Sequence, residues 1–179
     1  MYSYSQYPGL WILSISPKYI LYRISAKLFN KAITDDFMKA ENTILPKRAT
    51  FGSAGYDFCS PYDVELIPGV WTDIDTGVRL DNEDCCVDYN NEVIRRWFML
   101  IVPRSGLSNR YGFRIRNTVG IIDMDYRDNI KAKVTVDVPY TLKKGERFMQ
   151  GIVLPFGCFV HEIPPTNERV GGFGSTGKI

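Results

Sequence analysis

Strict alternation of apolar and polar residues between positions 131 and 138 constrains the fold of this chain more than any other feature. The apolar set is Ala132, Val134, Val136 and Val138, and the polar set is Lys131, Lys133, Thr135 and Asp137. Successive side chains of a β-strand point to opposite faces of the sheet. The segment is therefore predicted to be a half-buried strand, with its valines in the core.

Further short apolar segments predict more strands. Residues 97–102 are continuously apolar and end at Pro103, which predicts a strand buried on both faces. Additional strands are expected at residues 64–67, 77–80, 113–116 and 147–155. Pro68-Gly69 and Lys144-Gly145 supply turns between them. A short helix is predicted only around residues 34–40, so the fold class is all-β, a sandwich, barrel or jelly roll.

Length and charge limit the organisation of the chain and its partners. The 179 residues suit a single domain, predicted as residues 21–165, preceded by an extension at 1–20 and followed by a tail at 166–179. A net charge of +2 gives no electrostatic reason to expect nucleic acid or a membrane as partner. Pro17, Lys18 and Arg23 interrupt the apolar residues near the start, well short of the ~20 that a membrane span needs.

Cysteine and histidine usage argues against a resident metal cluster. Cys59, Cys85, Cys86 and Cys158 form no C-x-x-C pair, and His161 is the one histidine. We expect reduced thiols and an intracellular protein, cytoplasmic or nuclear.

Polar residues of catalytic type gather in five segments. In chain order these are Ala54-Gly-Tyr-Asp57, Pro103-Arg-Ser-Gly106, Gly120-Ile-Ile-Asp-Met-Asp-Tyr-Arg127, Gly145-Glu-Arg-Phe-Met-Gln150, and Arg169 with the glycine-rich tail Gly171-Gly-Phe-Gly-Ser-Thr-Gly177. They supply donors for phosphate, a ring that can stack on a base, and carboxylates for a metal or a water. This inventory fits Mg²⁺-assisted attack of water on a nucleoside polyphosphate.

The five segments, in this order, resemble the motifs of the trimeric deoxyuridine triphosphatases. PRSGL, GIIDMDYR and GGFGSTG carry the resemblance, which extends over roughly residues 21–177. It implies a distorted jelly-roll or β-barrel-like fold and hydrolysis of dUTP to dUMP and pyrophosphate. It also implies a homotrimer whose active sites are shared between subunits, so that the tail of one subunit closes over a site built by the others.

The resemblance also implies roles for individual residues. Asp123 matches the carboxylate that orients and deprotonates the attacking water, and Tyr126 matches the ring that excludes a 2′-hydroxyl. Asp125 is expected to be structural. A strand, turn and strand at residues 111–123 would admit uracil, with contacts from Asn117, Gly120, Ile121 and Ile122.

The remaining motif residues match those that bind the phosphate chain and the metal. Arg104, Ser105, Gly106 and Gln150 would grip the phosphates, and Asp57 would reach Mg²⁺ through water. Phe173 would stack on uracil while Arg169, Gly174, Ser175 and Thr176 close on the γ-phosphate. The chain departs from the family pattern in the spacing between Arg169 and Gly171, which is one residue shorter, and in a long polar loop between Asp81 and Arg96.

Two other readings of the motifs remain open at this point. A dCTP deaminase would share the fold, although the complete GIIDMDY and FGSTG patterns belong to the hydrolases. A catalytically weak regulatory module on the same fold would explain the long loop and the shortened spacing. Intact Asp123, Tyr126, Ser105 and Phe173 argue against that module.

Overall fold

The computed structural model describes residues 37–39, 43–80, 88, 94, 96–163 and 165. All of them belong to the compact unit Ile33–Ile179. The predicted extension at 1–20, the loop at 81–96 except residues 88, 94 and 96, and the tail at 166–179 lie outside the described residues. No helix among the described residues is long and apolar enough to cross a membrane.

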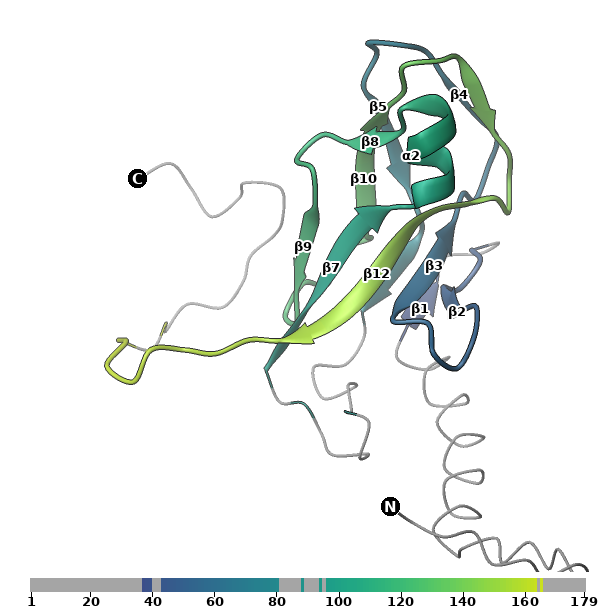
Figure 1. Ribbon diagram of the computed structural model, residues 1–179. Helices are drawn as coiled ribbons and strands as arrows, with labels where there is room; N and C mark the ends of the chain where they lie inside the picture. The colour runs from purple at the N-terminus through teal and green to yellow at the C-terminus, as the bar shows by residue number, and fades with distance from the viewer. Residues whose placement is uncertain are drawn as a thin grey trace, which may run out of the picture. The chain divides into compact units, whose positions relative to one another are not determined.

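Twelve strands and one short helix make up the described chain (Figure 1). The elements are β1 (Phe37–Lys39), β2 (Lys47–Arg48), β3 (Gly55–Cys59), β4 (Val64–Leu66), β5 (Thr72–Asp75), β6 (Val78–Leu80), β7 (Trp97–Pro103), α2 (Ser105–Tyr111), β8 (Arg114–Ile115), β9 (Gly120–Asp123), β10 (Lys131–Thr135), β11 (Tyr140–Leu142) and β12 (Arg147–Pro155). The strands pair as a five-stranded sheet β2-β3-β12-β7-β9, a three-stranded sheet β5-β10-β8, and the pairs β1-β6 and β11-β4. The all-β prediction is confirmed.

The alternating segment at 131–138 forms β10 but ends earlier than predicted. Ala132, Val134 and Val136 are buried as expected, whereas Val138 is 49% exposed. The backbone N–H groups of Asp137 and Val138 both donate to the carbonyl of Tyr111, at 2.8 and 3.3 Å. These two hydrogen bonds to the last residue of α2 replace strand pairing, so the strand ends before them and Val138 faces away from the core.

The one described helix is α2, which the sequence did not indicate. The prediction of a helix around 34–40 is wrong for residues 37–39, which form β1. Arg104 is the N-cap of α2 and makes no side-chain cap hydrogen bond, so the usual start signal is missing. The C-terminal end of α2 has a clear stop signal, because Gly112 takes a left-handed conformation with φ of 63° and its N–H donates to the carbonyl of Ser108.

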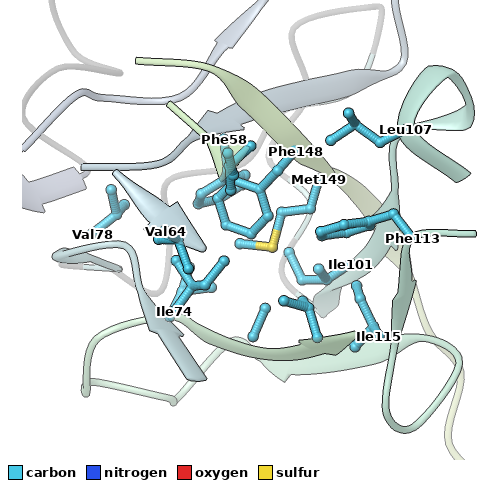
Figure 2. Close-up of a cluster of buried hydrophobic side chains, with 14 of the residues drawn as sticks. Phe58, Val64, Ile74, Val78, Ile101, Leu107, Phe113, Ile115, Phe148 and Met149 are labelled. Carbon is cyan, nitrogen blue, oxygen red and sulfur yellow. The ribbon is translucent and has the colours of Figure 1, made fainter. Parts of the chain in front are cut away.

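The core lies between the five-stranded and three-stranded sheets. Phe58, Phe148 and Met149 from the large sheet are fully buried with Ile74 and Val134 from the small one, and Figure 2 shows most of this cluster. Phe113 meets Phe148 edge-on, with ring centroids 6.2 Å apart. The core therefore fixes β3 and β12 side by side, and these two strands carry the first group of site residues.

A close contact in this core makes a prediction about Gly151 in β12. A Cβ added there would lie 2.5 Å from Sδ of Met99 and 2.9 Å from Cε2 of Phe58. Both neighbours are buried and at least one of them must shift, so Gly151→Ala should lower the free energy of unfolding by about 1–3 kcal/mol. Gly52→Ala is the matched control, since nothing lies within 4 Å of its added Cβ. Urea unfolding checks the pair, and equal stability of the two variants would contradict the packing described here.

The carboxylate of Asp63 ties β4 to the turn before β12 and makes the stability depend on pH. Its oxygens accept the backbone N–H of Lys144 at 2.8 Å and the ammonium of Lys143 at 2.9 Å. These hydrogen bonds lower the pKa of Asp63 by favouring its charged form, the Lys144 N–H most of all. A lowered pKa in the folded state stabilises the fold above the unfolded-state pKa, and this stability is lost as the pH falls through the folded-state value.

The Asp63→Asn variant should therefore lose less stability in acid than the parent. Over a titration from about pH 7 to about pH 3, its free energy of unfolding should fall less steeply below about pH 4. Urea unfolding at each pH provides the measurement. Parallel curves for the parent and the variant would show that Asp63 contributes nothing to the acid sensitivity.

Candidate active site

The first group of site residues centres on Asp57 in β3. From its sequence alone, the motif Ala54-Gly-Tyr-Asp57 could equally form a tight turn. In the structure, residues 55–59 form a strand instead, and Asp57 is only 5% exposed. Gln150 of β12 lies directly opposite and donates from Nε2 to Oδ1 of Asp57 at 3.0 Å. Gly55 allows this approach, because a Cβ there would lie 3.1 Å from Cβ of Gln150.

Arg104 joins this group from the end of β7. Its backbone N–H donates to the carbonyl of Phe148 at 3.0 Å, which fixes the start of α2 against β12. From there its Nε reaches Oδ1 of Asp57 at 3.2 Å, while its side chain stays 31% exposed. Ser105 and Gly106, the first residues of α2, are exposed beside it. The structure thus brings together the predicted residues Asp57, Arg104 and Gln150.

Arg147 completes the group, and the sequence analysis did not select it. Its NH1 atom donates to Oδ2 of Asp57 at 3.0 Å, and its side chain is 47% exposed. Two guanidinium groups therefore flank one buried carboxylate, which leaves the cluster with a formal charge of +1. A half-exposed cationic cluster with fixed donors is suited to binding an anion such as a phosphate chain.

Cys59 lies beside this cluster on β3 as a free thiol. Burial and the neighbouring charge of Asp57 raise its pKa, and the cations Arg147, Lys47 and Arg104 offset part of that rise. A raised pKa keeps the thiol protonated at neutral pH, so Cys59 is a poor nucleophile.

The second group of site residues lies on β9 and the turn that follows it. Gly120 packs against β7 so closely that a Cβ would lie 3.1 Å from Cβ of Ile101. Ile121 is 60% exposed and Asp123 is exposed at the end of the strand. The N–H of Tyr126 donates to the carbonyl of Asp123 at 3.0 Å, and its hydroxyl donates to the carbonyl of Asn129 at 3.1 Å. Tyr126 is 5% exposed, and its ring belongs to the hydrophobic core.

The predicted strand-turn-strand at 111–123 is only partly correct. Tyr111 ends α2, and the two strands β8 and β9 pair with β10 and β7 rather than with each other. The turn between them holds Asn117, whose carbonyl accepts the N–H of Val119 at 2.7 Å. Thr118 in its centre has φ of +68°, an uncommon conformation for a β-branched residue. The segment is therefore a strained connection between two sheets.

The two groups lie on the same sheet face but far apart in one chain. Asp57, Gln150 and Val102 are opposite one another across β3, β12 and β7, and Asp123 is opposite Phe98. With about 3.3 Å per residue along β7 and about 4.8 Å between strands, Asp57 and Asp123 are on the order of 20 Å apart. One chain therefore does not bring the predicted base to the phosphate-type donors.

The remaining predicted residues fall outside the described part of the chain. These are Arg169, Phe173, Gly174, Ser175 and Thr176. Among the residues that are described, no group of three or more His, Cys, Asp or Glu side chains is arranged to hold a metal ion.

Comparisons with known proteins agree with this fold and these motifs. The sequence model of the dUTPase family matches residues 41–177. The deoxyuridine 5′-triphosphate nucleotidohydrolase of Dictyoglomus turgidum is 36% identical over 143 residues, which cover 74% of this chain and 90% of that protein. The enzyme of the same name from Cronobacter sakazakii is 30% identical over 164 residues, 87% of this chain and 97% of that one.

Solved structures show the same similarity. The dUTPase from Streptococcus mutans matches with a TM-score of 0.55 and 26% identity, covering 69% of this chain and 97% of that chain. The Staphylococcus bacteriophage 80alpha dUTPase with dUPNHPP has a TM-score of 0.57 at 24% identity, covering 79% and 97%. The β-rich fold is shared with dUTPases, which are nucleotide hydrolases. The chain belongs to the dUTPase family.

Proposed function

We propose that this chain hydrolyses dUTP to dUMP and pyrophosphate by attack of water on the α-phosphate. The observation that carries the proposal is the Asp57 cluster, in which two guanidinium groups and an amide are fixed around one buried carboxylate. Arg104, Ser105, Gly106 and Gln150 would bind the phosphate chain there. Family membership and the names of the relatives supply the nucleotide, since both relatives described above are dUTP nucleotidohydrolases.

Asp123 is the proposed general base. Its carboxylate is exposed at the end of β9, and the turn to Tyr126 fixes its backbone. It would orient the water and take its proton as the oxygen attacks the α-phosphate. The buried ring of Tyr126 would leave no space for a 2′-hydroxyl, so selection of deoxyribose would be steric. The segment proposed for uracil consists of the turn at Asn117 and the strand residues Gly120, Ile121 and Ile122.

Mg²⁺ fits this site only when oxygen atoms of the substrate supply most of its ligands. Oδ1 of Asp57 forms an ion pair with Arg104 and accepts from Gln150, while Oδ2 accepts from Arg147 and retains one lone pair for a metal-bound water. A metal held mainly by phosphate oxygens suits that donor set. When bound, Mg²⁺ would neutralise charge on the phosphate chain. A phage phi11 dUTPase with the same fold is described with a structural Mg(II) ion.

A homotrimer with shared active sites would resolve the separation of the two groups. Phe98, Leu100 and Val102 of β7 are only half-buried, and Ile121 and Leu154 on the same sheet face are 60% and 36% exposed. The segment after β12 exposes Phe159, Val160 and Ile163 by 86–93%. Burial of such apolar surface in another subunit is favourable. The trimer would also bring Asp123 of one subunit to the Asp57 cluster of another. The tail at residues 166–179 would then act as a lid.

Oxygen labelling tests the reaction itself. Hydrolysis of dUTP in H₂¹⁸O with Mg²⁺ should place the label in dUMP and leave pyrophosphate unlabelled, and EDTA should abolish turnover. Label in the pyrophosphate would move the attack to the β-phosphate and remove the role given to Asp123. Ammonia release from dCTP under the same conditions would instead identify a deaminase.

A further inference from the structure

We propose that Arg147 is a positioning residue for the phosphate chain and that it acts through Asp57. This inference rests on the proposed function, because it concerns the substrate of that same site. Arg147 donates to Oδ2 of Asp57 at 3.0 Å, on the opposite side of the carboxylate from Arg104 at 3.2 Å and Gln150 at 3.0 Å. The carboxylate is thus held on both of its oxygens.

The local shape of β12 places Arg147 where it can do this. Residues three apart in a regular strand face opposite sides of the sheet, so Arg147 and Gln150 should not both reach Asp57. A register shift between Arg147 and Met149 breaks the alternation, and Phe148 and Met149 are both buried in succession. This β-bulge puts Arg147 opposite Cys59, on the same face as Gln150 and Asp57. Bulges of this kind commonly re-aim a side chain beside an active site.

The burial of Asp57 makes this arrangement consequential. Asp57 is 5% exposed with Arg147 in place, and Arg147 is the one donor to Oδ2 among the described side chains. Without it, Oδ2 would be left unpaired and the carboxylate would be free to turn toward another donor. Arg104 and Gln150, which share Oδ1, would then lose the orientation that points their remaining donors at phosphate.

A surface ion pair is the competing explanation for Arg147. Its side chain is 47% exposed, and isolated exposed pairs contribute little to stability. The two explanations differ in what they predict for ligands. A positioning role weakens only ligands that carry the β- and γ-phosphates, whereas an ordinary ion pair leaves nucleotide affinity unchanged.

Calorimetric binding of two ligands separates these outcomes. The ligands are dUMP and the non-hydrolysable α,β-imido analogue of dUTP, titrated into the full chain with Mg²⁺. We expect Arg147→Gln to weaken the triphosphate analogue about tenfold and to leave dUMP within about twofold. Arg147→Lys keeps the charge without the planar donor and should fall between the variant and the parent. Arg114→Gln is the control, because Arg114 lies on the three-stranded sheet and pairs with the exposed Asp137.

A double-mutant cycle tests whether the effect passes through Asp57. In an Asp57→Asn background, the further change Arg147→Gln should alter affinity for the analogue less than about twofold. Full additivity, an equal loss for both ligands, or no change in either would overturn the proposal. Should Arg147→Gln fail to fold, parent-like binding by Arg147→Lys would overturn it as well. A parent that binds neither ligand would instead refute the proposed function, and this inference with it.

Discussion

Asp123→Asn should lower kcat for dUTP by about 10²–10⁴-fold, the usual contribution of a positioned general base. The substitution keeps the size and the backbone turn to Tyr126 but removes the group that accepts a proton from water. Binding of the imido analogue should be retained, because Asp123 is proposed to act on the water rather than on the phosphate chain. Steady-state kinetics and calorimetry on the same protein provide the two measurements.

Asp125→Asn is the matched control for this substitution. Asp125 lies two residues further on, is also exposed, and is expected to be structural. Its kcat should remain close to that of the parent. A comparable loss in both variants, or full activity in Asp123→Asn, would remove Asp123 from the role of base.

Arg104→Ala should reduce kcat/KM for dUTP by about 10²–10³-fold, similar to the removal of one fixed donor from developing charge. Arg104 is the half-exposed cation that the carbonyl of Phe148 and the carboxylate of Asp57 hold in place. Its loss removes a charge-assisted donor from the leaving pyrophosphate and leaves Oδ1 of Asp57 with Gln150 alone. The variant should still fold, as measured by its melting temperature, because Arg104 is outside the core.

Arg114→Ala is the control for a lost arginine. Arg114 on β8 pairs at 2.6 Å with Asp137, which follows β10, and both side chains are exposed. Activity should be almost unchanged, as for most surface ion pairs. A loss in Arg114→Ala as large as that in Arg104→Ala would show that the effect is one of general charge or folding.

Local patterns predicted the strands well where one face is buried. The alternation at 131–138 identified β10, because burial of one face imposes a period of two on the sequence, and the continuous apolar segment at 97–102 identified β7. The expectation that β7 is buried on both faces is not met in one chain, since Phe98 and Leu100 are half-buried. A sequence does not distinguish a face covered by its own chain from a face covered by another subunit.

The cluster around Asp57 depends on long-range pairing that a sequence pattern does not reveal. Asp57 and Arg147 are ninety residues apart, and the antiparallel pairing of β3 with β12 brings them together. The β-bulge at Phe148 changes which side chains share a face, so the spacing of Arg147 and Gln150 gives the wrong answer by simple alternation. Helix α2 was missed for a related reason, since tertiary contacts of Arg104 replace the usual capping residue.

Pyrophosphate release from dUTP, dTTP, dCTP and UTP, assayed in parallel with Mg²⁺, tests the central claim most directly. We expect turnover of dUTP alone, because the connection at Asn117 would reject the other bases and Tyr126 would reject ribose. The same assay on a chain ending at Glu168 should show little turnover, as expected if the tail closes the site. No release from dUTP by the folded, assembled protein would contradict the proposed activity, and equal release from UTP would contradict the role of Tyr126.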